Sequence, residues 1–333
     1  MCYTKTSVSA ASHRRQPARE AGKYAARAAG GLMAAFLLSV APARADVVDD
    51  WSRIALHTVV SFEQRPDHAA IEMAMVHVAM FETMNFIEGA YVPRFLVKPY
   101  RSARVSSEVA AAAAAHYVLA QLHPQHKAAL DAALLHSAAA IPDVQEKSGA
   151  LITGRALGGN IYAILASDLS SAGAGASSKT SEVQASTRGS GANSVAWYWI
   201  MGQFIEAQRL SAIESARLYA LVSLALSEVY GGTRDPKDGS EHACAPCAAG
   251  AALRFILESE SGSGGNSGMT LTSVSATGAA YTSSRIREYA RGLSREQAAH
   301  MDQRSIRAGE EMGRKIGSRM LANYKPLSVT AAQ

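Results

Sequence analysis

Two cysteines and a histidine lie close together in the second half of the chain. Cys244 and Cys247 are spaced as Cys-Ala-Pro-Cys, and His242 lies two residues before the first of them. Two thiols at this spacing near the start of a helix can form a local disulfide, carry lowered pKa values or bind a metal. Zinc needs a fourth ligand that the sequence does not supply, and a thioredoxin-like enzyme needs a βαβ pattern that is absent. The spacing favours a disulfide that stabilises the start of a helix, with thiol or metal chemistry at His242-x-Cys244-x-x-Cys247 as the alternative.

The other histidines do not form the pattern of a metal site. His57, His68 and His77 lie on predicted helices without carboxylates arranged around them. His123 and His126 flank a proline turn, where we expect them to be exposed. We therefore expect no metal centre built from these residues.

Charge is distributed unevenly along the chain. The 333 residues carry a formal net charge of +5, but residues 1–45 hold seven Lys or Arg residues and a single acid, Glu20. The remainder has 26 basic and 27 acidic residues, which is close to balance. Because the excess of basic residues lies in residues 1–45, the charge of the remaining chain does not support a nucleic-acid-binding protein with a basic face.

Residues 1–45 have the organisation of an export signal. A basic stretch to Arg27 is followed by an apolar segment, residues 28–40, and by Ala43-Arg44-Ala45, a small-x-small cleavage pattern. The apolar segment is shorter than the roughly 20 residues needed to span a bilayer. We expect cleavage before Asp46, which gives a soluble periplasmic or secreted protein without stable membrane insertion.

The elements that must position these residues are predicted to be helices. Hydrophobic residues make up 48% of the chain and aromatic residues only 7%, and alanine is abundant, which favours helices over a β-sandwich. Helical spacing and capping residues predict helices that begin near Asp50, Ala69, Ser106, Gln125, Pro142 and Ser211, with two more between 284 and 323. Residues 170–194 and 261–268 are rich in Ser and Gly and are expected to be flexible loops. The prediction is one all-α domain over residues 46–333.

Several segments together resemble the superfamily of vanadium-dependent haloperoxidases and type 2 phosphatidic acid phosphatases (PAP2), in its exported bacterial branch. The similar segments are residues 75–85 (MVHVAMFETMN), Tyr91-Val92-Pro93, Trp197-Tyr198-Trp199, residues 215–221 (SARLYAL) and residues 309–317 (GEEMGRKIG). The resemblance covers nearly all of the chain after residue 45. It implies a helical bundle that binds a tetrahedral oxyanion, phosphate or vanadate, through three motifs.

The three motifs of this superfamily are altered in the chain. The block with Lys and Arg-Pro is missing near 231–237, where Arg234 and Lys237 do not match its spacing. The position of the acid–base histidine holds Pro246. Arg295 resembles the arginine of the third motif, and the resemblance implies that it holds the oxyanion. The position of the histidine that attacks phosphate or ligates vanadium holds Met301, whose thioether sulfur does neither, and His300 lies beside it. His300 also fits an ordinary surface histidine, so both interpretations of this residue stay open.

The resemblance therefore implies an exported protein with impaired catalysis and a remnant oxyanion pocket. Vanadate is the cofactor that the superfamily implies, and a small oxyanion such as phosphate or vanadate is the expected partner. A working haloperoxidase or phosphatase would need a rearranged pocket built from His300, Arg295 and Arg234. The substrate and the oligomeric state do not follow from the sequence.

Overall fold

The computed structural model describes residues 47–62, 66–96, 105–139, 141–174, 191–231, 244–262, 273–274, 280–281 and 303–327. The chain divides after Ala45, with residues 46–333 as the second unit. The expected export signal, residues 1–45, lies outside the described residues.

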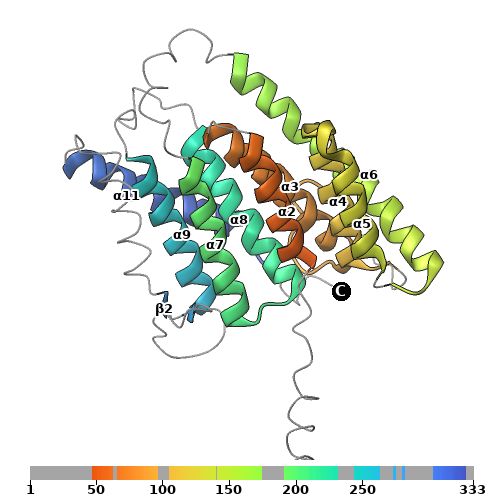
Figure 1. The fold of residues 1–333 in the computed structure, drawn as a ribbon. Helices are drawn as coiled ribbons and strands as arrows, with labels where there is room; N and C mark the ends of the chain where they lie inside the picture. Colours follow the sequence, from red (N-terminus) through yellow and green to blue (C-terminus); the bar gives the residue numbers. More distant parts are fainter. Residues whose placement is uncertain are drawn as a thin grey trace, which may run out of the picture. The chain divides into compact units, whose positions relative to one another are not determined.

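Helices make up nearly all of the described structure, which confirms the all-α prediction (Figure 1). Two strands of two residues each, β1 (Ser273–Val274) and β2 (Ala280–Tyr281), pair in an antiparallel manner, with Ser273 opposite Tyr281. The helices are α2 (Val47–Phe62), α3 (Pro66–Glu88), α4 (Ser107–Leu122), the short 3₁₀ helix η1 (Pro124–His126), α5 (Lys127–Ala139), α6 (Val144–Ala174), α7 (Gly191–Gln208), α8 (Ala212–Gly231), α9 (Ala245–Gly262) and α11 (Gln303–Asn323).

Helix α3 forms the centre of the bundle, and α2, α4, α6, α7 and α8 all pack against it. Because it is surrounded, its apolar residues occupy every side of the helix rather than one stripe. Met73, Val76, Met80 and Met84 are all buried. By length and composition the segment His68–Glu88 could cross a membrane, but 83% of its apolar window is buried inside the fold. This burial is what a core helix of a helical bundle requires.

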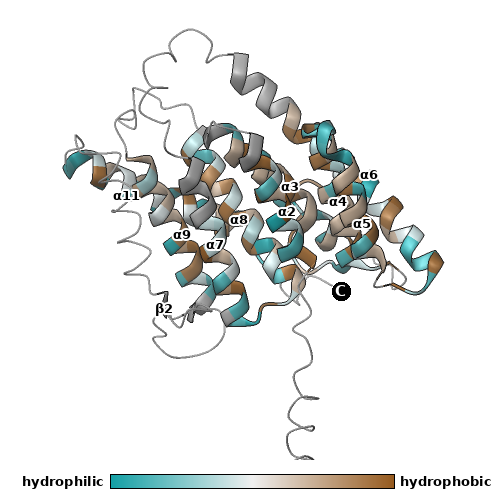
Figure 2. Cartoon of the chain, in the orientation of Figure 1, coloured by the Kyte–Doolittle hydropathy of each residue, from teal (hydrophilic) through white to brown (hydrophobic). Residues whose placement is uncertain are grey.

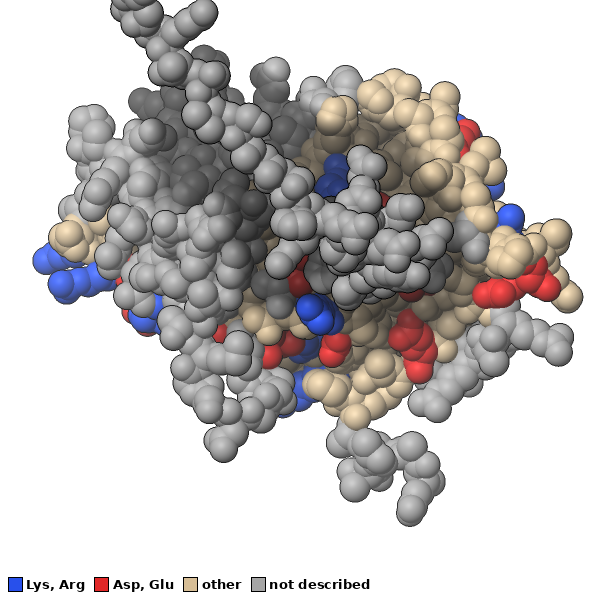
Figure 3. Space-filling view, turned by 60° about the horizontal axis from the view of Figure 1, so that its bottom comes forward, with Lys and Arg blue, Asp and Glu red and all other residues tan. Residues whose placement is uncertain are grey.

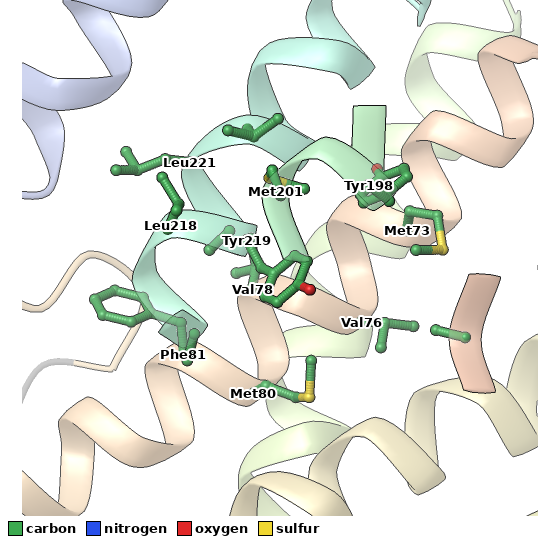
Figure 4. Packing of buried hydrophobic residues seen from close by; sticks show 14 of the residues in the cluster. Met73, Val76, Val78, Met80, Phe81, Tyr198, Met201, Leu218, Tyr219 and Leu221 are labelled. Carbon is green, nitrogen blue, oxygen red and sulfur yellow. The ribbon is translucent and has the colours of Figure 1, made fainter. Parts of the chain in front are cut away.

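Figure 4 shows how the core is filled between α3, α7 and α8. Val78 and Phe81 of α3 face Leu218 and Tyr219 of α8, and Met201 of α7 lies beside them. The outer helices bury one side and expose the other, so apolar and polar residues alternate around them (Figure 2). On the face shown in Figure 3, acidic and basic side chains lie near one another, as the balanced charge after residue 45 suggests.

Local signals in the sequence set several helix ends. Ser106 caps α4, where its hydroxyl accepts a hydrogen bond from the Val109 N–H at 3.3 Å. Glu214 accepts from the Ser211 N–H at 2.8 Å, as the expected capping box requires. Gly89 ends α3 with φ 64°, a left-handed conformation that glycine adopts without steric cost.

Other boundaries differ from the predictions. Helix α6 continues to Ala174, into the segment expected to be a loop from residue 170, because Ser170, Ser171 and Ala172 do not prevent a helix from continuing. Helix α9 likewise reaches Gly262, and the rest of both expected loops up to residue 190 and from 263 lies outside the described residues.

The expectation that His123 and His126 are exposed was wrong. His126 is half-buried. His123 is 5% exposed. Its side chain is buried, and its Nε2 lies 3.0 Å from Oε2 of Glu72 on α3. The proline turn at Pro124 folds back against the bundle, so a residue beside a turn became part of the interior. A partner carboxylate compensates for the burial of this polar ring.

Two helix pairs approach so closely that only small residues fit between them. On α11, Gly309, Gly313 and Gly317 lie one turn apart and face Cys244, Ala248 and Ala252 at the corresponding turns of α9. A Cβ atom at Gly309 would lie 2.5 Å from the Cys244 carbonyl oxygen. Gly154 and Gly158 of α6 contact the backbone of α4 in the same way. The glycine positions therefore fix how these helices pair.

Candidate functional site

The end of α8 and the starts of α9 and α11 lie at the same end of the bundle. Helix α8 runs antiparallel to α9 and α11, because Arg217 near its start contacts Glu260 and Tyr324 at the ends of the other two. Its last residue therefore lies at the end of the bundle where α9 and α11 begin. The Cys244 N–H donates to the Ser305 carbonyl oxygen at 3.0 Å, which fixes the starts of α9 and α11 side by side.

The first turn of α9 is the helix N-terminus to which the sequence resemblance assigns an oxyanion. The Cys247 N–H donates to Cys244 Sγ at 3.2 Å, and the Ala248 N–H donates to the Cys244 carbonyl oxygen at 2.9 Å. Pro246 has no N–H, and it is buried in this turn. Proline suits the first turn of a helix, so the fold accepts it. The proline also leaves this turn without one of the N–H donors that a helix N-terminus can offer an anion.

Cys244 and Cys247 are joined by a disulfide, with their Cα atoms 5.2 Å apart. Cys244 has no exposed surface and Cys247 is 4% exposed. Thiol exchange requires access to the sulfur atoms, which this packing denies. The bond closes the first turn of α9, against which Gly309 of α11 packs. This position fits a structural role at the start of the helix.

Most of the other suspected residues are not described by the structure. Arg234, Lys237 and His242 precede α9, and Arg295, His300 and Met301 precede α11; all six lie outside the described residues. Within the described ranges, no group of three or more His, Cys, Asp or Glu side chains is arranged to hold a metal ion.

A buried carboxyl group, that of Glu82, lies in the C-terminal half of α3, and the sequence-based predictions did not include it. Glu82 is 1% exposed, and its Oε2 accepts a hydrogen bond from the Phe95 N–H at 3.5 Å. Burial raises its pKa to about 7, although backbone N–H groups of Phe95, Arg94 and Leu96 and the charge of Arg94 act in the opposite direction. The sequence signal that could have identified Glu82 is an acidic residue within the mostly apolar run of residues 75–87.

A second polar network crosses the centre of the bundle. The ring of His77 lies between two hydroxyls, with Nδ1 2.6 Å from Ser223 Oγ and Nε2 3.0 Å from Ser52 Oγ. It stacks on Tyr219 with ring centroids 4.9 Å apart, and the Tyr219 hydroxyl donates to Asp49 at 2.6 Å. Burial lowers the pKa of His77 to about 3, so the ring is neutral. A serine–histidine pair with no exposed surface cannot meet a substrate, and it serves the core.

Comparison with known proteins adds no assignment. The chain matches no protein-family model, no curated protein and no solved structure. What the protein does must therefore be argued from its own residues.

Proposed function

We propose that the chain is an exported helical protein of the haloperoxidase and PAP2 type that has lost catalysis and retains at most weak affinity for phosphate or vanadate. The observation that carries the proposal is the first turn of α9, which holds Pro246 and the disulfide where the chemistry of that superfamily needs a histidine and free N–H groups. The meeting of α8, α9 and α11 at one end supports a scaffold of that type.

The loss of activity follows from what the altered residues can no longer do. Proline at 246 cannot give or take a proton, and methionine at 301 cannot attack a phosphate ester. Removing a positioned general acid or base costs roughly 10²–10⁴-fold in rate, and loss of a nucleophile costs at least as much. Arg295 supplies a cation for an oxyanion, but one arginine without the missing Lys and Arg-Pro block is a weak anchor.

Activity assays test this proposal directly. The mature protein should show no bromide peroxidation with vanadate and hydrogen peroxide, and negligible hydrolysis of an aryl phosphate. His300→Ala should leave both results unchanged. Vanadate-dependent turnover by the unmodified protein that disappears in His300→Ala would show that His300 has taken over the displaced role, and it would overturn the proposal.

Anion binding is tested separately by thermal unfolding. Millimolar orthovanadate or phosphate should raise the melting temperature slightly, since a ligand that binds the folded state stabilises it. The increase should vanish in Arg295→Ala and persist in Arg307→Ala, a matched control at an exposed position of α11. Equal shifts in both variants would count against an oxyanion site at Arg295.

Export is tested by the N-terminus of the protein found outside the cytoplasm. Cleavage after Ala45 should give a chain that starts at Asp46. Recovery of the protein in the membrane fraction with residues 28–40 retained would contradict this part of the proposal.

A further inference from the structure

The C-terminal segment after α11 is fastened to the loop after α3. The Val92 N–H donates to the Lys325 carbonyl oxygen at 3.1 Å, and the Leu327 N–H donates to the Ala90 carbonyl oxygen at 3.0 Å. These two bonds surround an isolated antiparallel bridge between Tyr91 and Pro326. Residues 90–92 and 325–327 therefore form a small two-stranded contact, which we call the C-terminal junction.

Side chains from the neighbouring helices hold the junction in place. Asn85 of α3 binds the backbone of Tyr91 on both sides, donating to its carbonyl oxygen at 3.0 Å and accepting from its N–H at 2.8 Å. Arg217 of α8 donates to the Tyr324 carbonyl oxygen at 2.8 Å and lies over the Tyr91 ring, 5.0 Å from its centroid. The junction thus depends on α3 and α8 as much as on its own backbone.

Glu82 lies one turn before Asn85 on α3 and interacts electrostatically with Tyr324, the residue that precedes the C-terminal strand of the junction. Its carboxyl group receives N–H groups of the loop at 94–96, and its Oε1 has no hydrogen-bond partner among the described residues. Burial raises the pKa of the Tyr324 hydroxyl, and the nearby charge of Glu82 raises it further. A buried carboxyl oxygen without a partner is costly when it is charged and far less so when it is protonated.

The charges around Glu82 do not neutralise it. Arg94 is the cation that faces it, and Arg94 is itself exposed, with its guanidinium 5.6 Å from the Tyr324 ring centroid. Arg217 is engaged by Glu260 at 2.6 Å. The carboxylates of Glu88, Glu214 and Glu260 act on neighbouring Tyr91 and add negative charge to this region.

We propose that the C-terminal junction is a proton-operated latch, closed when Glu82 is protonated and opened when Glu82 ionises. Opening releases residues 325–327 from residues 90–92, and it lets water reach the carboxylate. The role of the latch as a sensor of external pH rests on the proposed export, because an exported protein experiences the pH of its surroundings. The latch itself does not depend on the proposed oxyanion site.

The sign and size of the effect follow from linkage. In the open form Glu82 regains its ordinary pKa of 4.5, whereas in the closed form its pKa is about 7. Between pH 4.5 and about 7, Glu82 is ionised in the open form and protonated in the closed form. The equilibrium constant for opening therefore rises by up to about tenfold for each unit that the pH increases. Above pH 7 both forms are ionised and the opening equilibrium no longer changes.

Amide hydrogen exchange on the full-length mature protein tests the latch at the two amides that close it. The protection factors of Val92 and Leu327, corrected for intrinsic exchange, should fall roughly tenfold per pH unit between pH 5 and pH 7. In Glu82→Gln they should stay high and independent of pH, because the amide imitates the protonated carboxyl. Glu258→Gln, at an exposed acid of α9 that does not act on the junction, should behave like the wild type.

A second measurement does not depend on any variant. Infrared difference spectra of the wild-type protein should show a carboxylic-acid carbonyl band that titrates near neutral pH. Protection factors of Val92 and Leu327 that do not change with pH in the wild type would overturn the latch. The same holds if Glu82→Gln retains the wild-type pH dependence, or if the band titrates at the ordinary pKa of a glutamate.

Discussion

Several polar side chains, among them His77, are buried in the core, although the helices that form it are mostly apolar. His77 is enclosed by Ser52, Ser223, Tyr219 and Tyr198, and as a neutral ring it can donate from one nitrogen and accept at the other. Protonation would place a charge in the interior without a carboxylate beside the ring. The network therefore fixes one arrangement of α2, α3, α7 and α8 only while the ring stays neutral.

Acid should destabilise the fold through His77. Its folded pKa of about 3 lies below the ordinary value of 6.5, so the unfolded chain binds more protons between these values. The contribution of His77 to stability is complete above pH 6.5 and is lost as pH falls, by about 1.4 kcal/mol per unit. Urea unfolding of wild type and His77→Gln should give free energies whose difference shrinks from pH 6.5 towards pH 4. A constant difference across this range, or the same trend in exposed His57→Gln, would contradict this account.

At the scale of elements, the pairing of helices depends on glycine. A methyl group at Gly313 would meet the Ala248 carbonyl oxygen and lie 2.8 Å from the Ala251 Cβ, so α11 must move away from α9. Gly149 of α6 is different, because its nearest neighbour would be Val105 Cγ2 at an ordinary 3.6 Å. The two positions form a matched pair, since both are glycines inside helices.

Gly313→Ala should lower the free energy of unfolding by roughly 1–3 kcal/mol, because overpacking outweighs the gain in helix propensity. Gly149→Ala should raise it by up to about 1 kcal/mol, since alanine favours the helix and meets no obstacle. Chemical denaturation of the two variants measures both changes. Stabilisation by both substitutions would mean that α9 and α11 do not approach as closely as described.

The disulfide should contribute modestly to the stability of α9. It closes a loop of only four residues, for which the chain-entropy relation gives roughly 2 kcal/mol. The double substitution Cys244→Ala with Cys247→Ala should lower stability by about this amount, and reductant should then have no further effect. Hydrogen exchange should increase first at the starts of α9 and α11, which are joined by the bond from the Cys244 N–H to Ser305. Unchanged stability and exchange would show that the bond has no structural role.

At the scale of the whole molecule, two buried groups act on stability with opposite signs. His77 makes the fold more stable as pH rises from about 3 to 6.5, whereas Glu82 makes it less stable from 4.5 to about 7, because its folded pKa is raised. Between pH 4.5 and 6.5 the two groups change the free energy of unfolding with pH in opposite directions and by similar amounts. The protein should therefore show a weak dependence of stability on pH between 4.5 and 6.5.

Single variants should reveal the opposed slopes. Glu82→Gln should make the free energy of unfolding rise steadily from pH 4.5 to 6.5, and His77→Gln should make it fall over the same range. The double variant should restore a nearly flat profile, since the two groups lie on different parts of α3 and act independently. Thermal or urea unfolding at a series of pH values distinguishes this from the alternative in which neither substitution changes the slope.

Much of the helical arrangement could be predicted from the sequence because its signals are local. Ser106, Ser211 with Glu214, and Gly89 set helix ends through contacts with residues three or four positions away. The apolar character of residues 69–87 likewise predicts a buried helix. Such interactions need no knowledge of distant parts of the chain, so composition and spacing suffice for the all-α class.

Tertiary structure decided the features that depend on residues far apart in the chain. Three contacts join such residues: the burial of His123 against Glu72, the position of His77 between Ser52 and Ser223, and the pairing of residues 90–92 with 325–327. The raised pKa of Glu82 has the same origin, because burial inside the assembled bundle removes water from its carboxyl group. A single sequence gives the periodicity of each helix but not which helix faces which. The environment of a buried charge is therefore fixed only when the bundle is assembled.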